Sequence, residues 1–184
     1  MSLDEIRDRY DRVSQAFAAK IEAVPADKWD APSPCEGWTA RDVVKHVVEA
    51  PSMIFKMAGR EFGDVPDVAA DPAAAFASSR QKIREALEDA DAANAEYDSV
   101  FGRTSLAQSI DRFVNFDLIV HAWDLSRATG LDETIDPQEI GRVREVAESF
   151  GDAARSPHVF GPEVPVEPGA DEQSKLLAFL GRKA

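Results

Sequence analysis

The sequence is poor in the residues that build disulfides and thiolate metal sites. Its 184 residues include a single cysteine, Cys35, and three histidines. One cysteine excludes an internal disulfide and any zinc site made from several thiolates. A site for a soft metal would therefore use almost all the imidazole groups in the chain.

Two further absences narrow the class of protein. The sequence has no uninterrupted apolar run of about 18 residues, which excludes a membrane-spanning helix. Its charged first residues, MSLDEIRDR, differ from a signal peptide, so we expect a cytoplasmic protein. Positive charge is also scarce: 21 Lys and Arg face 34 Asp and Glu, for a formal net charge of −13. Nucleic acids and anionic membranes require clusters of Lys and Arg, so we expect neither as a partner.

What is present predicts an all-α fold. Apolar residues recur at steps of three and four, and alternating strand patterns are nearly absent. We expect residues 1–184 to form one domain, a four-helix bundle with an additional helix and an extended C-terminal tail, about 156–184, packed on it. The predicted helices cover 3–24, 40–57 (capped by Thr39 and kinked at Pro51), 72–95 (capped by Asp71), 104–129 (ended by Gly130), 137–150 and 172–180.

Polar residues that fall on predicted apolar faces are the strongest functional signal. Asp117 and His121 lie in the middle of the apolar face of the helix 104–129, and Asp124 lies on the same face. His46 lies in the middle of the apolar face of the helix that follows Thr39. Buried carboxylates and imidazoles must be paired or coordinated. Because residues four apart on a helix point the same way, Asp117 and His121 can bind one ion, with His46 as a third ligand from a facing helix.

Two imidazoles and one carboxylate suit Zn²⁺, with Ni²⁺, Fe²⁺ and Mn²⁺ as competitors. Three protein ligands leave one coordination position open, which is typical of a catalytic metal that lowers the pKa of a bound water or thiol. Asp124, one turn beyond His121, is a candidate second-shell partner that hydrogen-bonds a ligand. Two alternatives remain open: a buried Asp–His pair without metal, and a hydrogen-bonded core histidine at position 46.

Other candidate residues carry weaker predictions. We interpret Cys35 as a small residue of a Pro-rich loop, because the sequence offers no nearby group that would activate its thiol. His158 is predicted to be a surface or packing residue of the tail. Trp38 and Trp123 either line a pocket or belong to the core or a subunit interface.

Two motifs resemble a known family. The stretch WDAPSPCEGWTARDVVKH, from Trp29 to His46, resembles the start of the mycothiol-dependent maleylpyruvate isomerase N-terminal family, within the DinB-like superfamily. The stretch DLIVHAWDLSRATG, from Asp117 to Gly130, resembles the second signature of that family. The segments FGPEVPV and LLAFLGR resemble the ending of a single-domain actinobacterial branch, so the similarity covers nearly the whole chain.

The resemblance implies a DinB-like four-helix bundle whose metal, usually zinc, is held by His46, Asp117 and His121. Related enzymes use the metal to activate a low-molecular-weight thiol, mycothiol, as co-substrate. We therefore expect a metal-dependent thiol S-transferase acting on an electrophile such as an unsaturated acid or an epoxide, and a possible homodimer. The isomerase itself has Glu at position 117 and an additional C-terminal domain. Since this chain ends at Ala184, we do not expect maleylpyruvate isomerisation.

Two other functions remain open. The metal site can be a non-enzymatic structural or sensory module that acts through protein contacts. The chain can also be a metal-free remnant, in which the His and Asp residues form only a buried polar network.

Overall fold

The computed structural model describes residues 1–99, 102–155 and 159–183. The chain divides into two compact units, Met1–Asp132 and Glu133–Ala184. His158 lies outside the described residues. The expectation of one domain with the tail packed on it stays a prediction.

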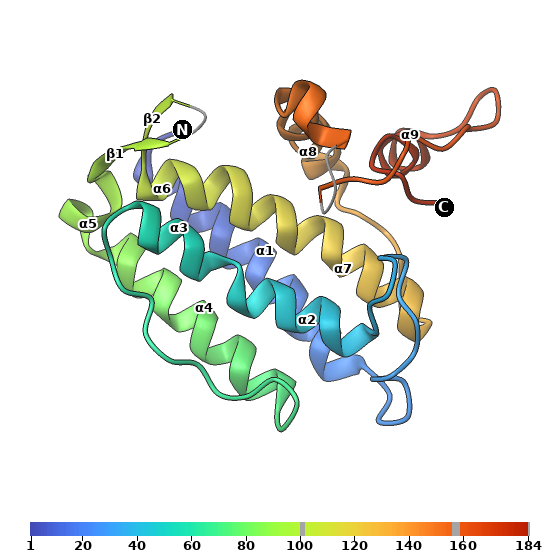
Figure 1. The fold of residues 1–184 in the computed structure, drawn as a ribbon, viewed down its shortest axis with the longest axis horizontal. Coiled ribbons are helices and arrows are strands. Elements are labelled where there is room, and N and C mark those ends of the chain that lie inside the picture. Colours follow the sequence, from blue (N-terminus) through green and yellow to red (C-terminus); the bar gives the residue numbers. More distant parts are fainter. Residues whose placement is uncertain (100–101, 156–158, 184) are drawn as a thin grey trace. The chain divides into compact units, whose positions relative to one another are not determined.

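The first unit is a four-helix bundle, as predicted (Figure 1). Helix α1 packs on α4 and on α7, and α2 packs on the same two helices, so the four form a closed ring of neighbours. Helix α3 continues the line of α2. The bounds are Leu3–Ala23 for α1, Ala40–Glu49 for α2, Pro51–Met57 for α3, Pro72–Glu88 for α4 and Asn115–Thr129 for α7.

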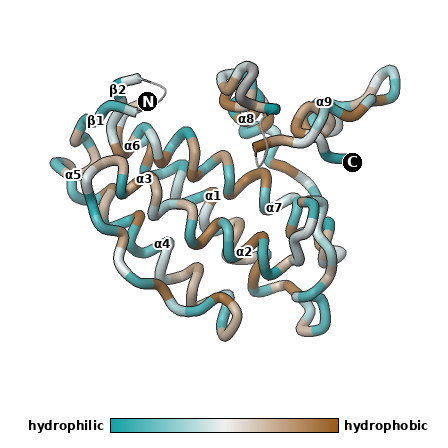
Figure 2. Tube along the Cα trace, viewed as in Figure 1, coloured by the Kyte–Doolittle hydropathy of each residue, from teal (hydrophilic) through white to brown (hydrophobic). Residues whose placement is uncertain are grey.

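Helices α1, α2 and α4 each bury one stripe of side chains, which is why their apolar residues recur at three and four, whereas α7 is buried around most of its circumference. The buried apolar residues of α1 are Ile6, Tyr10, Val13, Phe17 and Ile21. The Phe17 side chain is completely buried, and its ring centroid lies 5.0 Å from that of Phe76 on α4. Burial of one such side chain contributes about 1.5–3 kcal/mol. Hydrophilic and hydrophobic residues accordingly alternate along the bundle helices (Figure 2).

The start of α2, which carries His46, is fixed by a capping box at Thr39, the predicted cap. The Thr39 hydroxyl accepts a hydrogen bond from the Asp42 backbone N–H at 3.2 Å, and the Asp42 carboxylate accepts from the Thr39 backbone N–H at 2.9 Å. These bonds from the Thr39 backbone and side chain hold the pKa of Asp42 below its usual value. The helix divides before Pro51, as predicted, because proline cannot donate the next backbone hydrogen bond.

The single helix predicted over 72–95 is wrong in its C-terminal part. Helix α4 ends at Glu88, and a separate short helix, α5, covers Ala90–Asn94. The Asp89 carboxylate accepts hydrogen bonds from the backbone N–H groups of Asp91 and Ala92. An N-cap of this kind starts a new helix, which explains the interruption.

The start of the helix predicted over 104–129 also differs. Strands β1 (Glu96–Ser99) and β2 (Gly102–Ser105) pair antiparallel, so Thr104 lies in a strand. Ser105 is the actual cap of α6 (Leu106–Ser109), and a π-helical turn, η1 (Ile110–Val114), leads into α7. The end is as predicted: Gly130 has φ 78°, a left-handed conformation that glycine adopts at low cost.

The second unit contains α8 (Pro137–Ser149), the 3₁₀ turn η2 (Gly151–Arg155) and α9 (Glu172–Phe179), close to the predicted helices. The guanidinium groups of Arg144 and Arg155 lie 4.5 Å and 4.9 Å from the Phe179 ring centroid. The described residues from 159 to 170 form neither helix nor strand. Within the described ranges, no helix has both the length and the apolar character needed to cross a membrane.

Candidate metal centre between α2 and α7

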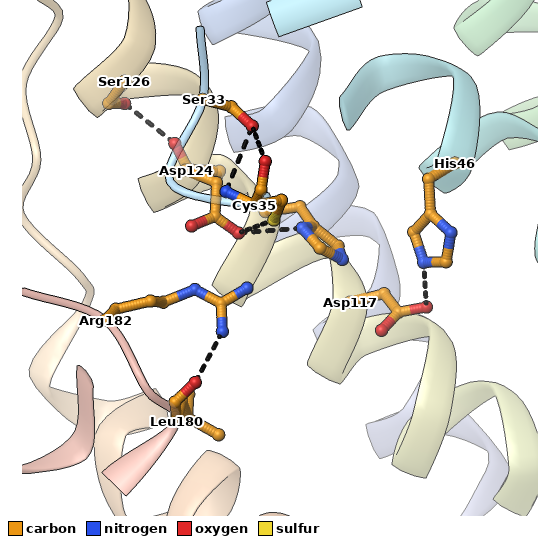
Figure 3. A network of polar contacts seen from close by, with 10 residues as sticks. Ser33, Cys35, His46, Asp117, Asp124, Ser126, Leu180 and Arg182 are labelled. Carbon is orange, nitrogen blue, oxygen red and sulfur yellow. Dashed lines mark hydrogen bonds and ion pairs between the residues drawn. The ribbon is translucent and has the colours of Figure 1, made fainter. Parts of the chain in front are cut away.

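The structure brings together the three ligands predicted from the sequence. His46 comes from α2, and Asp117 and His121 come from successive turns of α7, which packs against α2. One potential ligand atom from each residue lies within 4.8 Å of the other two. His46 Nε2 is 3.3 Å from Asp117 Oδ2 (Figure 3). The ring centroids of His46 and His121 are 4.8 Å apart.

This donor set fits a divalent cation. Zinc binds imidazole nitrogen and carboxylate oxygen at about 2.0–2.1 Å, which places neighbouring donors of a tetrahedron about 3.3 Å apart. The observed separation of His46 Nε2 and Asp117 Oδ2 equals that spacing. The other separations are at most 4.8 Å, so the donors would have to approach one another by up to about 1.5 Å to bind one zinc ion.

The prediction that all three ligands lie in the middle of buried faces is wrong for two of them. The side chains of His46 and Asp117 are 34% and 31% exposed, whereas that of His121 is 10% exposed. Met53, which lies in the same predicted helix 40–57, is 67% exposed. Packing against α4 and α7 buries Val43 and Val47 of α2 and leaves His46 at the border of the contact. The His46–Asp117 edge of the site is therefore partly accessible to solvent.

The surroundings of His46 change the pKa of its side chain. Burial by itself disfavours the charged imidazolium, but the hydrogen bond and the negative charge of Asp117, with the charge of Glu49, outweigh it. The pKa of His46 is consequently raised above its usual value. A proton and a metal ion then compete for the same side chain, because a metal ligand must be the neutral imidazole.

Asp124 contacts His121 on the side away from His46 and Asp117, as predicted for a residue that hydrogen-bonds a metal ligand (Figure 3). Its side chain is completely buried, and its Oδ2 is 2.9 Å from His121 Nδ1. The Cys35 thiol donates a hydrogen bond to the same oxygen, with Sγ 3.4 Å away (Figure 3). This role of Cys35 differs from the prediction of a small loop residue, since 89 residues separate it from Asp124 and no local pattern relates them. Ligand atoms of Cys35, His121 and Asp124 also lie within 4.8 Å of one another.

The loop before α2 places an aromatic side chain, that of Trp38, beside the site. Trp38 is half-buried, and its ring centroid lies 5.1 Å from the ring centroid of His46 and 6.0 Å from that of His121. Backbone hydrogen bonds hold the loop: the Ser33 N–H donates to the Trp38 carbonyl at 2.8 Å, and the Trp38 N–H donates to the Cys35 carbonyl at 3.0 Å. Trp38 therefore borders the candidate site, whereas Trp123, 1% exposed, belongs to the core.

The arrangement of helices defines an all-α protein of the DinB-like fold. Residues 10–126 match the sequence profile of the mycothiol maleylpyruvate isomerase N-terminal domain, and the chain belongs to that family. The matched region contains Cys35 and the four residues predicted for the site.

Two relatives of similar length are found. Two proteins described as uncharacterized, from Mycobacterium tuberculosis strains CDC 1551 / Oshkosh and ATCC 25618 / H37Rv, are each 30% identical over 179 residues. The alignment covers 94% of this chain and 95% of each relative. No solved structure matches the chain.

Proposed function

We propose that this protein binds a divalent metal ion, Zn²⁺ in preference to Ni²⁺, Fe²⁺ or Mn²⁺, through His46, Asp117 and His121. On this site it acts as an S-transferase for a low-molecular-weight thiol, with mycothiol as co-substrate. The observation that carries the proposal is the convergence of two imidazoles and one carboxylate, from two helices, within 4.8 Å.

The exposure of the ligands supports a catalytic site over a closed structural one. Three protein ligands leave a coordination position free, and the partly exposed His46 and Asp117 leave one side of the site open to small molecules. When bound, the metal ion lowers the pKa of a coordinated thiol and so supplies a nucleophile at neutral pH. The mycothiol in the name of the family supports the choice of thiol.

The proposed reaction is addition of the thiol to an electrophile such as an epoxide or an unsaturated acid. The thiol sulfur forms a bond to the electrophilic carbon, while the C–O bond of the epoxide or the π bond of the acid breaks. The proton of the thiol ends on the resulting oxygen or carbon, so no oxidant or reductant is needed. Trp38 beside His46 provides an apolar surface for the organic part of a substrate.

Metal content is the first test. The purified protein is expected to bind one Zn²⁺ per chain, and His46→Ala is expected to lose most of this affinity. Lys45→Ala is the matched control, because Lys45 is an exposed neighbour on the same helix. Unchanged zinc binding by His46→Ala would refute the site.

Turnover is the second test. The zinc-loaded protein is incubated with mycothiol and a panel of epoxides and unsaturated acids, and the thioether products are measured by mass spectrometry. A rate above background that is lost in Asp117→Ala supports the transferase. A rate equal to background, together with unfolding on zinc removal, would replace the transferase with a structural or sensory module that acts through protein contacts.

A further inference from the structure

The contacts behind His121 assign a function to Cys35 and Asp124 that the proposed function leaves open. His121 uses Nδ1 for its contact with Asp124, at 2.9 Å, which leaves Nε2 as the nitrogen available to a metal ion. An imidazole can bind a metal through Nε2 only when the proton of the neutral ring is on Nδ1. The group opposite Nδ1 therefore decides whether His121 is a competent ligand.

The neighbours of Asp124 favour one direction for the hydrogen bond to His121. A thiol is a donor to a carboxylate, so Asp124 Oδ2 acts as an acceptor toward Cys35 Sγ at 3.4 Å. The same oxygen faces His121 Nδ1 and is completely buried. An ionised carboxylate is an acceptor only, so an oxygen that accepts from Cys35 is suited to accept from His121 as well, which favours the tautomer with the proton on Nδ1.

We propose that Cys35 and Asp124 are positioning residues that act through His121: Asp124 holds the Nδ1–H tautomer, and Cys35 holds the Asp124 carboxylate in place. This inference rests on the proposed function for its metal, but the tautomer is a property of the metal-free protein. It also gives Cys35 a role different from that of a nucleophile. Its thiol is directed to a carboxylate, which does not activate it for attack.

The loop contacts extend the inference to Trp38. Cys35 and Trp38 lie on the same short loop, joined by the hydrogen bond from the Trp38 N–H to the Cys35 carbonyl. The thiol contact with Asp124 attaches this loop to α7, while the Trp38 ring lies against His46. Loss of the Cys35 thiol is therefore expected to disturb the position of Trp38 as well as that of the metal ligand His121.

Nitrogen NMR of the metal-free protein tests the tautomer directly. With ¹⁵N-labelled histidine at a pH where the rings are neutral, wild-type His121 is expected to carry its proton on Nδ1. In Asp124→Asn, the amide can donate to Nδ1, and we expect a shift of population toward the Nε2–H form. Asp111→Asn, which removes a carboxylate paired with Arg9 at 2.7 Å outside the site, is the matched control and should leave the tautomer unchanged. A wild-type His121 protonated on Nε2 would overturn the inference.

Zinc affinity, measured by competition with a chromophoric chelator, tests the consequence. Asp124→Asn is expected to bind zinc about 10–100-fold more weakly, the usual effect of losing an outer-shell partner. Cys35→Ala is expected to bind about two- to tenfold more weakly, the factor that corresponds to one hydrogen bond. Cys35→Ser retains a donor and should recover most of this loss. Equal affinities of wild type, Cys35→Ala and Cys35→Ser would refute the role of Cys35.

The two readouts separate this inference from the proposed function. If wild type binds no zinc but His121 carries its proton on Nδ1, the proposed metal function fails and the tautomer assignment stands. If Asp124→Asn does not fold, the wild-type tautomer and the Cys35 pair of variants still decide the matter. Unchanged tautomer and unchanged zinc affinity in a folded Asp124→Asn would overturn the role of Asp124.

Discussion

Zinc should stabilise the protein by an amount that depends on His46. A ligand that binds only the folded state adds about 2.7 kcal/mol when its free concentration is one hundred times its Kd. The site lies in the unit Met1–Asp132, whose unfolding entropy is about 0.28 kcal/mol per kelvin at about 2.1 cal/mol/K for each residue. The ratio of these two quantities predicts an increase of about 10 °C in the Tm of this unit.

Substitution of His46 by Ala should remove most of this increase. If the loss of one ligand weakens binding about a hundredfold, the linked free energy at the same zinc concentration falls to about 0.4 kcal/mol. The expected shift in Tm is then about 1–2 °C. Only the zinc-dependent shift is compared, so an effect of the substitution on the metal-free protein does not confuse the result.

Differential scanning calorimetry with zinc and with a chelator measures both shifts. Lys45→Ala, an exposed neighbour of His46, should retain the wild-type shift. Equal zinc-dependent shifts in wild type and His46→Ala would refute the assignment of the ligand. A wild-type Tm that does not change at saturating zinc would refute the metal site itself.

Three further predictions concern the metal-free protein and are measured by urea unfolding. Because the pKa of His46 is raised above its ordinary value of 6.5, the ion pair with Asp117 stabilises the fold below pH 6.5, and this contribution is lost as pH rises through the raised pKa. The advantage of wild type over His46→Gln should therefore shrink with rising pH, and a constant difference would contradict this. Thr39→Ala should cost about 1 kcal/mol through loss of the capping box of α2, whereas Thr39→Ser, which retains the hydroxyl, should cost less; equal losses would contradict the capping role. Phe17→Ala should cost about 3–5 kcal/mol because the ring is completely buried against Phe76, and a loss below about 1 kcal/mol would show that this contact is not part of a packed core.

The local features of the sequence predicted most of the helices. The steps of three and four in α1, the capping box at Thr39 and the glycine at 130 each depend on residues within one or two turns. The same periodicity placed Asp117, His121 and Asp124 on one face of α7, where the structure has them. The cap at Asp89 was not predicted, because a short helix start inside a longer helical pattern gives only a weak local signal. The hairpin before Ser105 was not predicted either, because strands of four residues are too short to show a clear alternation.

The candidate metal site shows most clearly which features the sequence determines and which depend on the tertiary structure. The sequence by itself determined which three residues are candidate ligands, because their spacing on two helices fixes the face on which each lies. Only the tertiary structure decided that His46 and Asp117 are at the open edge of the α2–α7 contact, and that Cys35 reaches Asp124. Periodicity determines the direction of a side chain around its own helix, whereas its exposure and its distant partners depend on how segments far apart in the chain pack together.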